Sequence, residues 1–184
     1  EFMAANLTLD VNNTDKISQH IAECRKKGVA VLSPDINESS FEFVVTDDGI
    51  RFGLGAIKNL GKNAVDAMLE ERERNGPFTD IASFLDRIAL ARVNRRVVEA
   101  LIKAGAFDTI HLNRASLVES MDRAFDFAAA SAANANQNGL FDMGGEDDHG
   151  SSTQEPDLVE VLPWGVREQL TQEKSALGFY LSGH

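Results

Sequence analysis

The residues best suited to bind a ligand lie in one segment rich in glycine and lysine, residues 53–65, which reads GLGAIKNLGKNAV. The pattern predicts a short helix, a tight turn and a second helix that begins at Gly61 and Lys62. In such a turn several backbone N–H groups have no intrahelical partner, and the N-terminus of the second helix carries partial positive charge. The segment therefore predicts a site for a phosphate-sized anion that requires no particular base sequence.

The individual residues of this segment have different expected roles. Gly55 and Gly61 let the backbone turn sharply and approach a ligand closely. Lys58 and Lys62 add positive charge, and Asn59 lies between them. This pattern is typical of a helix-hairpin-helix, a module that binds the nucleic-acid backbone. A plain pair of antiparallel helices with a glycine cap is the alternative that the pattern leaves open.

The charge of the chain is unevenly distributed around this segment. The net charge is −11, with 4 basic and 9 acidic residues over 1–50, and 2 basic and 9 acidic residues over 128–184. The middle, residues 51–127, carries 12 basic and 11 acidic residues. The predicted hairpin therefore lies in the part of the chain that tolerates a phosphate backbone, and we expect weak, salt-sensitive binding.

Composition limits the classes of protein to which the chain can belong. It has 184 residues, 43% of them hydrophobic, which predicts one or two small folded domains. No apolar run reaches the roughly 18 residues of a membrane span, and no signal peptide is visible. The single cysteine, Cys24, excludes a disulfide framework and a cysteine-rich zinc site, which fits a reducing cytoplasm. Because Met3 follows two other residues and the chain ends abruptly at His184, we expect a fragment of a longer protein.

The elements around the hairpin are predicted to be mostly helical. Asn13 or Thr14 can cap a helix that runs through residue 27, and residues 29–32 form a short strand. Pro34 marks the first expected domain boundary. Residues 41–45 and 50–52, separated by TDDG, predict a small β-hairpin that leads into the helix-hairpin-helix.

Further helices are predicted over residues 62–74, a short segment capped by Thr79, and residues 93–103 and 114–130. Arg95 and Arg96 lie on the basic face of the third of these. That face is either a second DNA contact or simply a solvated helix surface.

The character of the chain changes near residue 129. Residues 129–138 are rich in Ala, Ser and Asn, and residues 144–156 are rich in Gly, Ser and acidic residues, which predicts flexible segments. Between them stands an apolar pair, Leu140 and Phe141, preceded by Gln137. This pattern is typical of a linear docking peptide, in which two apolar side chains enter a pocket of a partner and the glutamine sets the register. A last helix follows Trp164.

The order of these motifs resembles the α subunit of bacterial DNA polymerase III, the C family of replicative polymerases. The resemblance rests on FMAA at 2–5, the helix end at 24–28, PDIN at 34–37, GLGAIK at 53–58 with Gly61, NRRV at 94–97, LIKAGAFD at 101–108 and LGFYLSGH at 177–184. It implies a mainly α fold with a small β-hairpin, built as a tandem helix-hairpin-helix domain plus a flexible acidic linker. The implied parts are the end of a fingers domain (1–33), the helix-hairpin-helix domain (34–130), a flexible segment with a clamp-binding peptide (131–160), and a helix leading to an absent oligonucleotide-binding barrel (161–184).

The resemblance also implies functions. Gly55, Lys58, Asn59, Gly61, Lys62, Arg95 and Arg96 are expected to bind duplex DNA. Gln137, Leu140 and Phe141 match the family's motif for docking on the sliding clamp, and other replicase subunits are further expected partners. The full-length protein is expected to be a DNA-directed DNA polymerase of the bacterial cytoplasm that uses Mg²⁺. The family's catalytic carboxylates lie upstream of this segment, so no residue here is assigned as catalytic or as a metal ligand, and the fragment needs no cofactor of its own.

Two alternatives remain. One is an error-prone relative within the same polymerase family, against which Gln137, Leu140 and Phe141 argue mildly. The other is a DNA-repair or adaptor protein built on helix-hairpin-helix repeats, without a polymerase.

Overall fold

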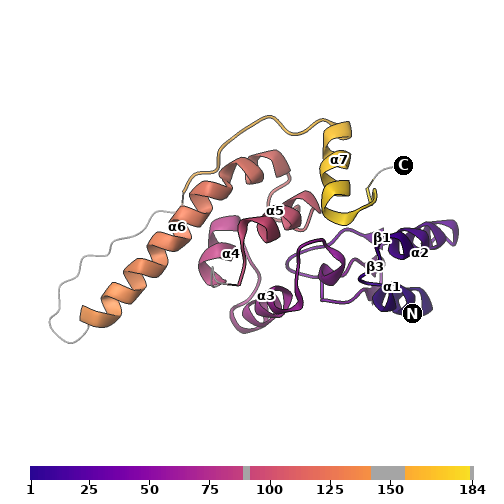
Figure 1. Ribbon diagram of the computed structural model, residues 1–184, viewed down its shortest axis with the longest axis horizontal. Coiled ribbons are helices and arrows are strands. Elements are labelled where there is room, and N and C mark those ends of the chain that lie inside the picture. Colours follow the sequence, from indigo (N-terminus) through magenta and orange to yellow (C-terminus); the bar gives the residue numbers. More distant parts are fainter. Residues whose placement is uncertain (89–91, 142–155, 183–184) are drawn as a thin grey trace.

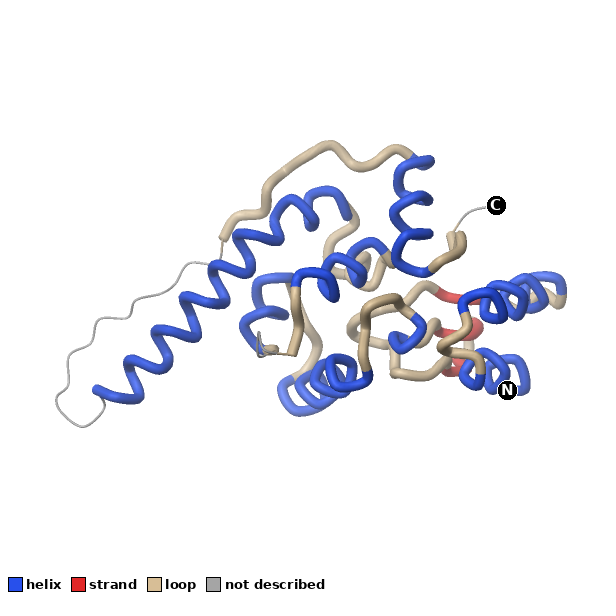
Figure 2. The backbone as a smooth tube through the Cα atoms, viewed as in Figure 1, coloured by secondary structure: helices blue, strands red, loops and turns tan. Residues whose placement is uncertain are grey.

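The computed structural model describes residues 1–88, 92–141 and 156–182, without the side chains of residues 138–141. The helices in these ranges are α1 (Phe2–Leu9), α2 (Thr14–Lys26), a 3₁₀ turn η1 (Leu54–Ala56), α3 (Lys62–Asn75), α4 (Ile81–Arg87), α5 (Arg95–Lys103), α6 (Arg114–Phe141) and α7 (Val166–Leu177). Three short strands, β1 (Val31–Leu32), β2 (Val44–Thr46) and β3 (Gly49–Arg51), complete the described elements. Figure 2 shows how strongly helix dominates, so the predicted fold class is confirmed.

The strands form one small sheet with the order β1-β3-β2. The predicted β-hairpin is present, because β2 pairs antiparallel with β3, and Val45 lies opposite Ile50. At Gly49 (φ 149°) a side chain would collide with the carbonyl of Ala30, so glycine is required where β1 approaches the hairpin. The parallel pairing of β1 with β3 joins segments on either side of Pro34. The small sheet therefore contains strands from both sides of the expected domain boundary. The boundary itself stays a prediction.

A single hydrophobic core extends from Leu7 near one end of the chain to Leu181 near the other. Its centre is a series of edge-to-face phenylalanine pairs, in which the ring centroids of Phe84 lie 4.9 Å from Phe78 and 5.1 Å from Phe107. Such pairs stabilise a core beyond the area that they bury. The elements that carry the predicted helix-hairpin-helix are thus packed on one common core.

Side-chain caps mark the starts of α2 and α4, with one correction to the prediction. Asn13 caps α2 as expected, because its Oδ1 accepts from the backbone N–H of Lys16 at 3.1 Å. The predicted cap Thr79 is wrong, since α4 is capped by Asp80, whose carboxylate accepts from Ser83 N–H at 2.7 Å. Thr79 instead donates its hydroxyl to that carboxylate. A carboxylate also interacts more favourably with the helix dipole than a hydroxyl does.

Helix α6 is longer than predicted. It continues beyond residue 130 through Phe141, so the expected flexible segment does not begin at residue 131. Alanine has the highest helix propensity, and an alanine-rich stretch therefore extends a helix even where it packs against nothing. Residues 129–141, named here the arm, project away from the rest of the molecule (Figure 1).

The chain returns from the arm as an extended segment, residues 156–165, which lies along the first half of α6. Ser120 Oγ accepts from Val159 N–H at 2.8 Å, and Ser116 Oγ accepts from Val161 N–H at 3.1 Å. Alternate residues of this returning segment thus pair with successive turns of the helix. The segment leads into α7, the predicted last helix. No helix in the described residues has the length and apolar character of a membrane span.

Candidate nucleic-acid interface

The predicted helix-hairpin-helix, called the hairpin from here on, is present, but its first helix is a single 3₁₀ turn, η1. Ile57 and Leu60 are buried and anchor the turn in the core, whereas Lys58 and Asn59 between them are exposed. The turn reverses at Asn59, which has a φ of 68°, the left-handed region that Asn tolerates better than most residues. Gly61 has an ordinary φ of −77°. The residue that makes the sharp turn is therefore Asn59, and the expectation that Gly61 does so is wrong.

The N-terminus of α3 is open. Gly61 is its N-cap residue and provides no side-chain cap. Within the described residues the backbone N–H groups of Asn59, Gly61, Lys62 and Asn63 donate to no protein acceptor. Uncapped N–H groups at the positive end of a helix form an anion site.

The two glycines of the hairpin have different surroundings. A side chain at Gly61 would meet no atom within 4 Å, so the space before α3 is free for a ligand. A side chain at Gly55 would instead lie 2.7 Å from the ring of Phe41. Gly55 is therefore required for the packing of Phe41, and the close approach it permits is to this ring.

The two lysines flank the open N–H groups. Both are exposed, and the side chain of Lys62 is 69% accessible and lies 2.8 Å from the carboxylate of Asp66 on the next turn of α3. Exposed pairs of this kind are weak, so a phosphate can compete with Asp66 for the ammonium group. Lys58 forms no ion pair within the described residues.

The structure separates the two arginines that the sequence grouped together. Arg96 lines a shallow cavity of about 140 Å³ together with Asn59 of the hairpin, Lys103 and Ser175. Arg95 points toward α6, where it pairs with Asp122 and its guanidinium lies 6.0 Å from the ring centroid of Phe125. Arg96 therefore lies beside the hairpin and Arg95 beside α6, and DNA binding by either residue stays a prediction.

One contributor to this site has no local signal in the sequence. The backbone N–H of Lys58 donates to the carbonyl of Ala176, near the C-terminal end of α7, at 2.9 Å. Ser175 and Ala176 also form part of the wall of the cavity beside Asn59. The two segments are more than a hundred residues apart, and only the fold brings them together.

A second turn, between α5 and α6, is closed by the protein's own side chains. Asn113 caps α6 by accepting from Ser116 N–H at 3.2 Å. The guanidinium of Arg114 is almost fully buried, 2.7 Å from Asp108 and 3.6 Å from Glu173. Burial acts to lower the pKa of Arg114, but these two carboxylates outweigh it and raise the pKa. Of these two turns, the first is therefore the one with an uncapped helix start.

The predicted docking peptide lies at the end of the arm. Gln137 is exposed there, and the backbone of Leu140 and Phe141 is helical up to the last residue of α6. Their side chains lie outside the described residues. The expectation of a flexible tether at these positions is wrong, because their backbone is helical.

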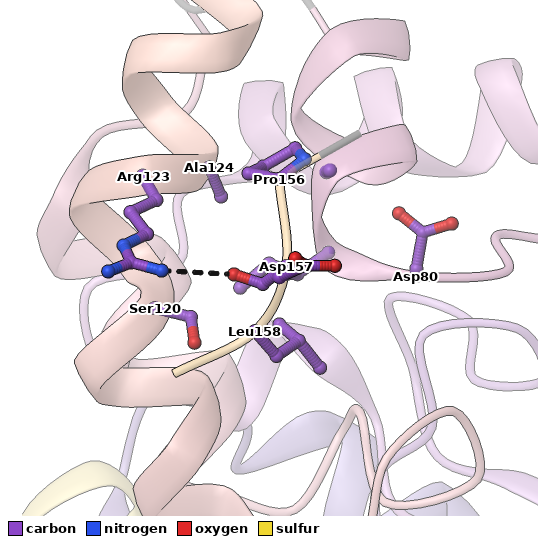
Figure 3. A pocket seen from close by; sticks show the side chains of 9 residues that line it. Asp80, Ser120, Arg123, Ala124, Pro156, Asp157 and Leu158 are labelled. Atoms are coloured by element: carbon purple, nitrogen blue, oxygen red, sulfur yellow. Dashed lines mark hydrogen bonds between the residues drawn. The ribbon is translucent and has the colours of Figure 1, made fainter. Parts of the chain in front are cut away.

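The cavity in Figure 3, of about 310 Å³, lies where the returning segment meets α4 and α6. Arg123 donates to the carbonyl of Asp157 at 3.4 Å, and Ser120 lies beside it. These polar groups hold the returning segment in place. No group of three His, Cys, Asp or Glu side chains suited to a metal ion occurs among the described residues.

Comparison with known proteins gives two results. A family model described as a helix-hairpin-helix motif matches residues 28–117. The whole chain is 44% identical to part of the DNA polymerase III subunit alpha of Neisseria meningitidis serogroup B, covering 16% of that protein. It is likewise 42% identical to its counterpart from Thermus aquaticus, covering 14%, and 38% identical to that from Mycobacterium tuberculosis, covering 16%.

The chain thus spans 14–16% of the length of these relatives. Because the similarity includes every residue of the chain at 38–44% identity, the chain belongs to the DNA polymerase III α-subunit family and corresponds to one segment of it.

Proposed function

We propose that this chain is the segment of a replicative DNA-directed DNA polymerase that binds the backbone of duplex DNA and docks on the sliding clamp. The observation that supports DNA binding best is the group of free N–H donors at the start of α3, flanked by Lys58 and Lys62. Backbone donors and cations bind phosphate without reading bases. Binding of this kind suits a polymerase, which must move along any sequence.

Polymerisation itself belongs, in this proposal, to the longer protein. Nucleotidyl transfer requires paired carboxylates that hold two Mg²⁺ ions. The described residues do not fit such a site, because no three metal-ligating side chains gather among them. In this proposal the Mg²⁺ binds at the catalytic carboxylates that the family resemblance implies upstream of this segment, and the present residues hold the DNA product.

The docking role rests on the sequence of Gln137, Leu140 and Phe141 and on their position. The arm places this peptide at one extremity of the molecule, away from the hairpin (Figure 1). The peptide and the hairpin can then engage a ring and its DNA at the same time. Two weak attachments in one molecule lengthen the residence time, because the second binding step becomes intramolecular. Other replicase subunits and a cytoplasmic location belong to the same proposal.

The two alternatives differ in how the relatives bear on them. The relatives named above are all described as DNA polymerase III subunit alpha, which favours a polymerase over a repair adaptor. The choice between a replicative and an error-prone polymerase depends on the docking peptide and on the test below.

Fluorescence anisotropy with a labelled duplex of random sequence tests DNA binding. We expect Lys62→Ala and Arg96→Gln to weaken binding severalfold and each to lower the salt slope by about one counterion. Arg95→Gln is the matched control, because this neighbouring arginine has the same charge but faces α6. Equal losses for Arg95→Gln and Arg96→Gln would mean that general charge, and not the hairpin site, binds the DNA.

Calorimetric titration with a bacterial sliding clamp tests the docking peptide. We expect binding that Phe141→Ala abolishes and that Lys62→Ala leaves unchanged. Absence of clamp binding by the intact, folded chain would reduce the proposal to duplex binding alone.

A further inference from the structure

We propose that the C-terminal turn of α7, residues 174–178, is a positioning element of the DNA-phosphate site, and that Gly178 is the residue that lets it reach the hairpin. This inference rests on the function proposed above and adds a part of the molecule that the hairpin motif does not include. Figure 1 shows α7 packed beside α5, with its lower end directed toward the hairpin-bearing body.

The side chains of Ile57 and Leu60 anchor the hairpin turn, but its exposed backbone makes few bonds to distant parts of the chain. Between the buried anchors Ile57 and Leu60, the backbone passes through the left-handed residue Asn59. Leu60 N–H donates to Ile57 carbonyl at 3.3 Å, which closes the turn on itself. Apart from the bonds to the adjoining η1 and α3, the bond from Lys58 N–H to Ala176 carbonyl is the one backbone hydrogen bond among the described residues that joins residues 57–61 to the rest of the chain. The position of the turn therefore depends on α7.

The end of α7 is, in contrast, firmly held. Ala176 and Leu177 are buried, and Phe179 packs 6.1 Å from the ring centroid of Phe52. The buried carboxylate of Glu173 accepts from Leu181 N–H at 2.6 Å and from Ser182 N–H at 2.8 Å. These contacts involve neither Lys58 nor Asn59, so α7 is a fixed support for the turn.

Gly178 decides how closely this support approaches. It is the C-cap of α7, with a φ of 90°, and its N–H donates to Lys174 carbonyl. A side chain at this position would collide with the Thr14 methyl group and would lie 3.3 Å from Cε of Lys58. Glycine is thus required for the left-handed cap and for the close packing of α7 against Thr14 of α2, and the missing side chain also leaves room for the side chain of Lys58.

The contact matters for the ligand because the same turn carries the free donors. Moving Lys58 away from Ala176 would shift Asn59 relative to Arg96, with which it lines one cavity. It would also change the direction of the N–H groups that precede α3. A displaced turn would retain its charged side chains, but its backbone N–H groups would no longer be placed to bind one phosphate together.

Gly178→Ala tests this inference against Gly76→Ala. Both glycines end a helix with positive φ, 90° and 84°, but a side chain at Gly76 meets nothing within 4 Å. We expect Gly76→Ala to lose at least as much stability from its backbone conformation, because a ψ of −178° places Gly76 in a region that is essentially restricted to glycine. Only Gly178→Ala should weaken duplex binding, roughly tenfold, with a salt slope lower by about one, as expected for one lost phosphate contact. Adding Thr14→Ser to Gly178→Ala removes the colliding methyl group and should restore part of the affinity.

The outcomes separate this inference from the proposed function. If the unmodified chain does not bind duplex DNA, the proposed function fails and the inference fails with it. If it binds and a folded Gly178→Ala variant binds equally well, the inference alone is overturned.

A Gly178→Ala variant that does not fold leaves a measurement on the unmodified chain. The Lys58 amide should then exchange with solvent as slowly as core amides and more slowly still when duplex is bound. Rapid exchange at Lys58 would overturn the inference.

Discussion

Asn59 combines an unusual backbone conformation with an exposed position in the turn. It is the one non-glycine residue with positive φ among those described, and it separates two buried anchors. An L-residue in the left-handed region pays a steric cost, which Asn offsets in part through its short polar side chain. This conformation lies next to the uncapped start of α3, and strained residues often cluster at ligand sites.

The backbone conformation of Asn59 can be separated from its side chain by two substitutions. Asn59→Ala and Asn59→Gly both remove the amide group, but only the alanine retains a Cβ in the left-handed region. We expect the alanine variant to be less stable than the glycine variant by about 1–2 kcal/mol. Urea unfolding followed by circular dichroism measures the difference. Equal stabilities would mean that the turn does not pass through positive φ at this residue.

Glu71 gives the molecule a dependence on acid pH. Hydrogen bonds from Asn75 and then from Arg87 lower the pKa of Glu71 below its ordinary value of 4.5. Because the folded state lowers the pKa, the stabilisation is fully present above pH 4.5 and is lost as the pH falls toward the folded-state pKa.

We therefore expect Glu71→Gln to reduce thermal stability at pH 7 and to have a progressively smaller effect as the pH falls below 4.5. Thermal melts of both proteins from pH 7 to pH 3 measure this. Asp66→Asn is the control, since its exposed partner Lys62 contributes little to stability. A Glu71→Gln effect that does not vary with pH would contradict the assignment.

At the residue scale, the sequence predicted the contiguous part of the site and not the rest. Lys58, Asn59 and Lys62 follow one another in a local motif, so their proximity needs no knowledge of the fold. Arg95 and Arg96 could not be distinguished, because which one faces the hairpin depends on how α5 packs between α6 and α7. The contribution of Ala176 was invisible for the same reason.

At the element scale, the amino-acid composition of a segment predicted its structure less well than the helix propensity of its residues. Residues 129–138 suggested a linker because they cannot build a core, but alanine needs no core to remain helical as the continuation of an existing helix. Strand β1 was predicted, whereas its parallel pairing with β3 was not, since the two segments are nearly twenty residues apart. The returning segment forms no helix or sheet of its own, and nothing in its local pattern indicates where it binds.

The returning segment yields a prediction for the element that it covers. Ser120 is buried and accepts from Val159 N–H while donating to Ser116 carbonyl at 2.6 Å. Ser120→Ala leaves the part-buried N–H of Val159 without its partner, so we expect a loss of about 1 kcal/mol. The exposed Ser175→Ala on α7 is the matched control and should change stability little. Urea unfolding measures both, and limited proteolysis should show earlier cleavage near residue 159 in the Ser120 variant only.

At the scale of the whole molecule, the proposed function requires the arm to connect two local features, the hairpin and the predicted docking peptide. The hairpin belongs to the packed body, while the docking peptide ends a helix that leaves this body (Figure 1). A helix holds its end at a set distance and direction, which a flexible tether of equal length does not. The gain from linking two attachments depends on whether their geometry permits simultaneous binding.

Shortening the arm tests this geometry. Deleting residues 129–135 removes about two turns and about 10 Å of helix, at 1.5 Å per residue, and leaves the peptide on nearly the same helix face. We expect unchanged affinity for free duplex and for free clamp, but faster dissociation from DNA that carries a clamp, measured by surface plasmon resonance. Deleting residues 144–150, an equal number after α6, leaves the helix length unchanged and should preserve slow dissociation. If the two deletions behave alike, the arm serves only as a tether, and the distance that it sets has no part in retaining the protein on DNA.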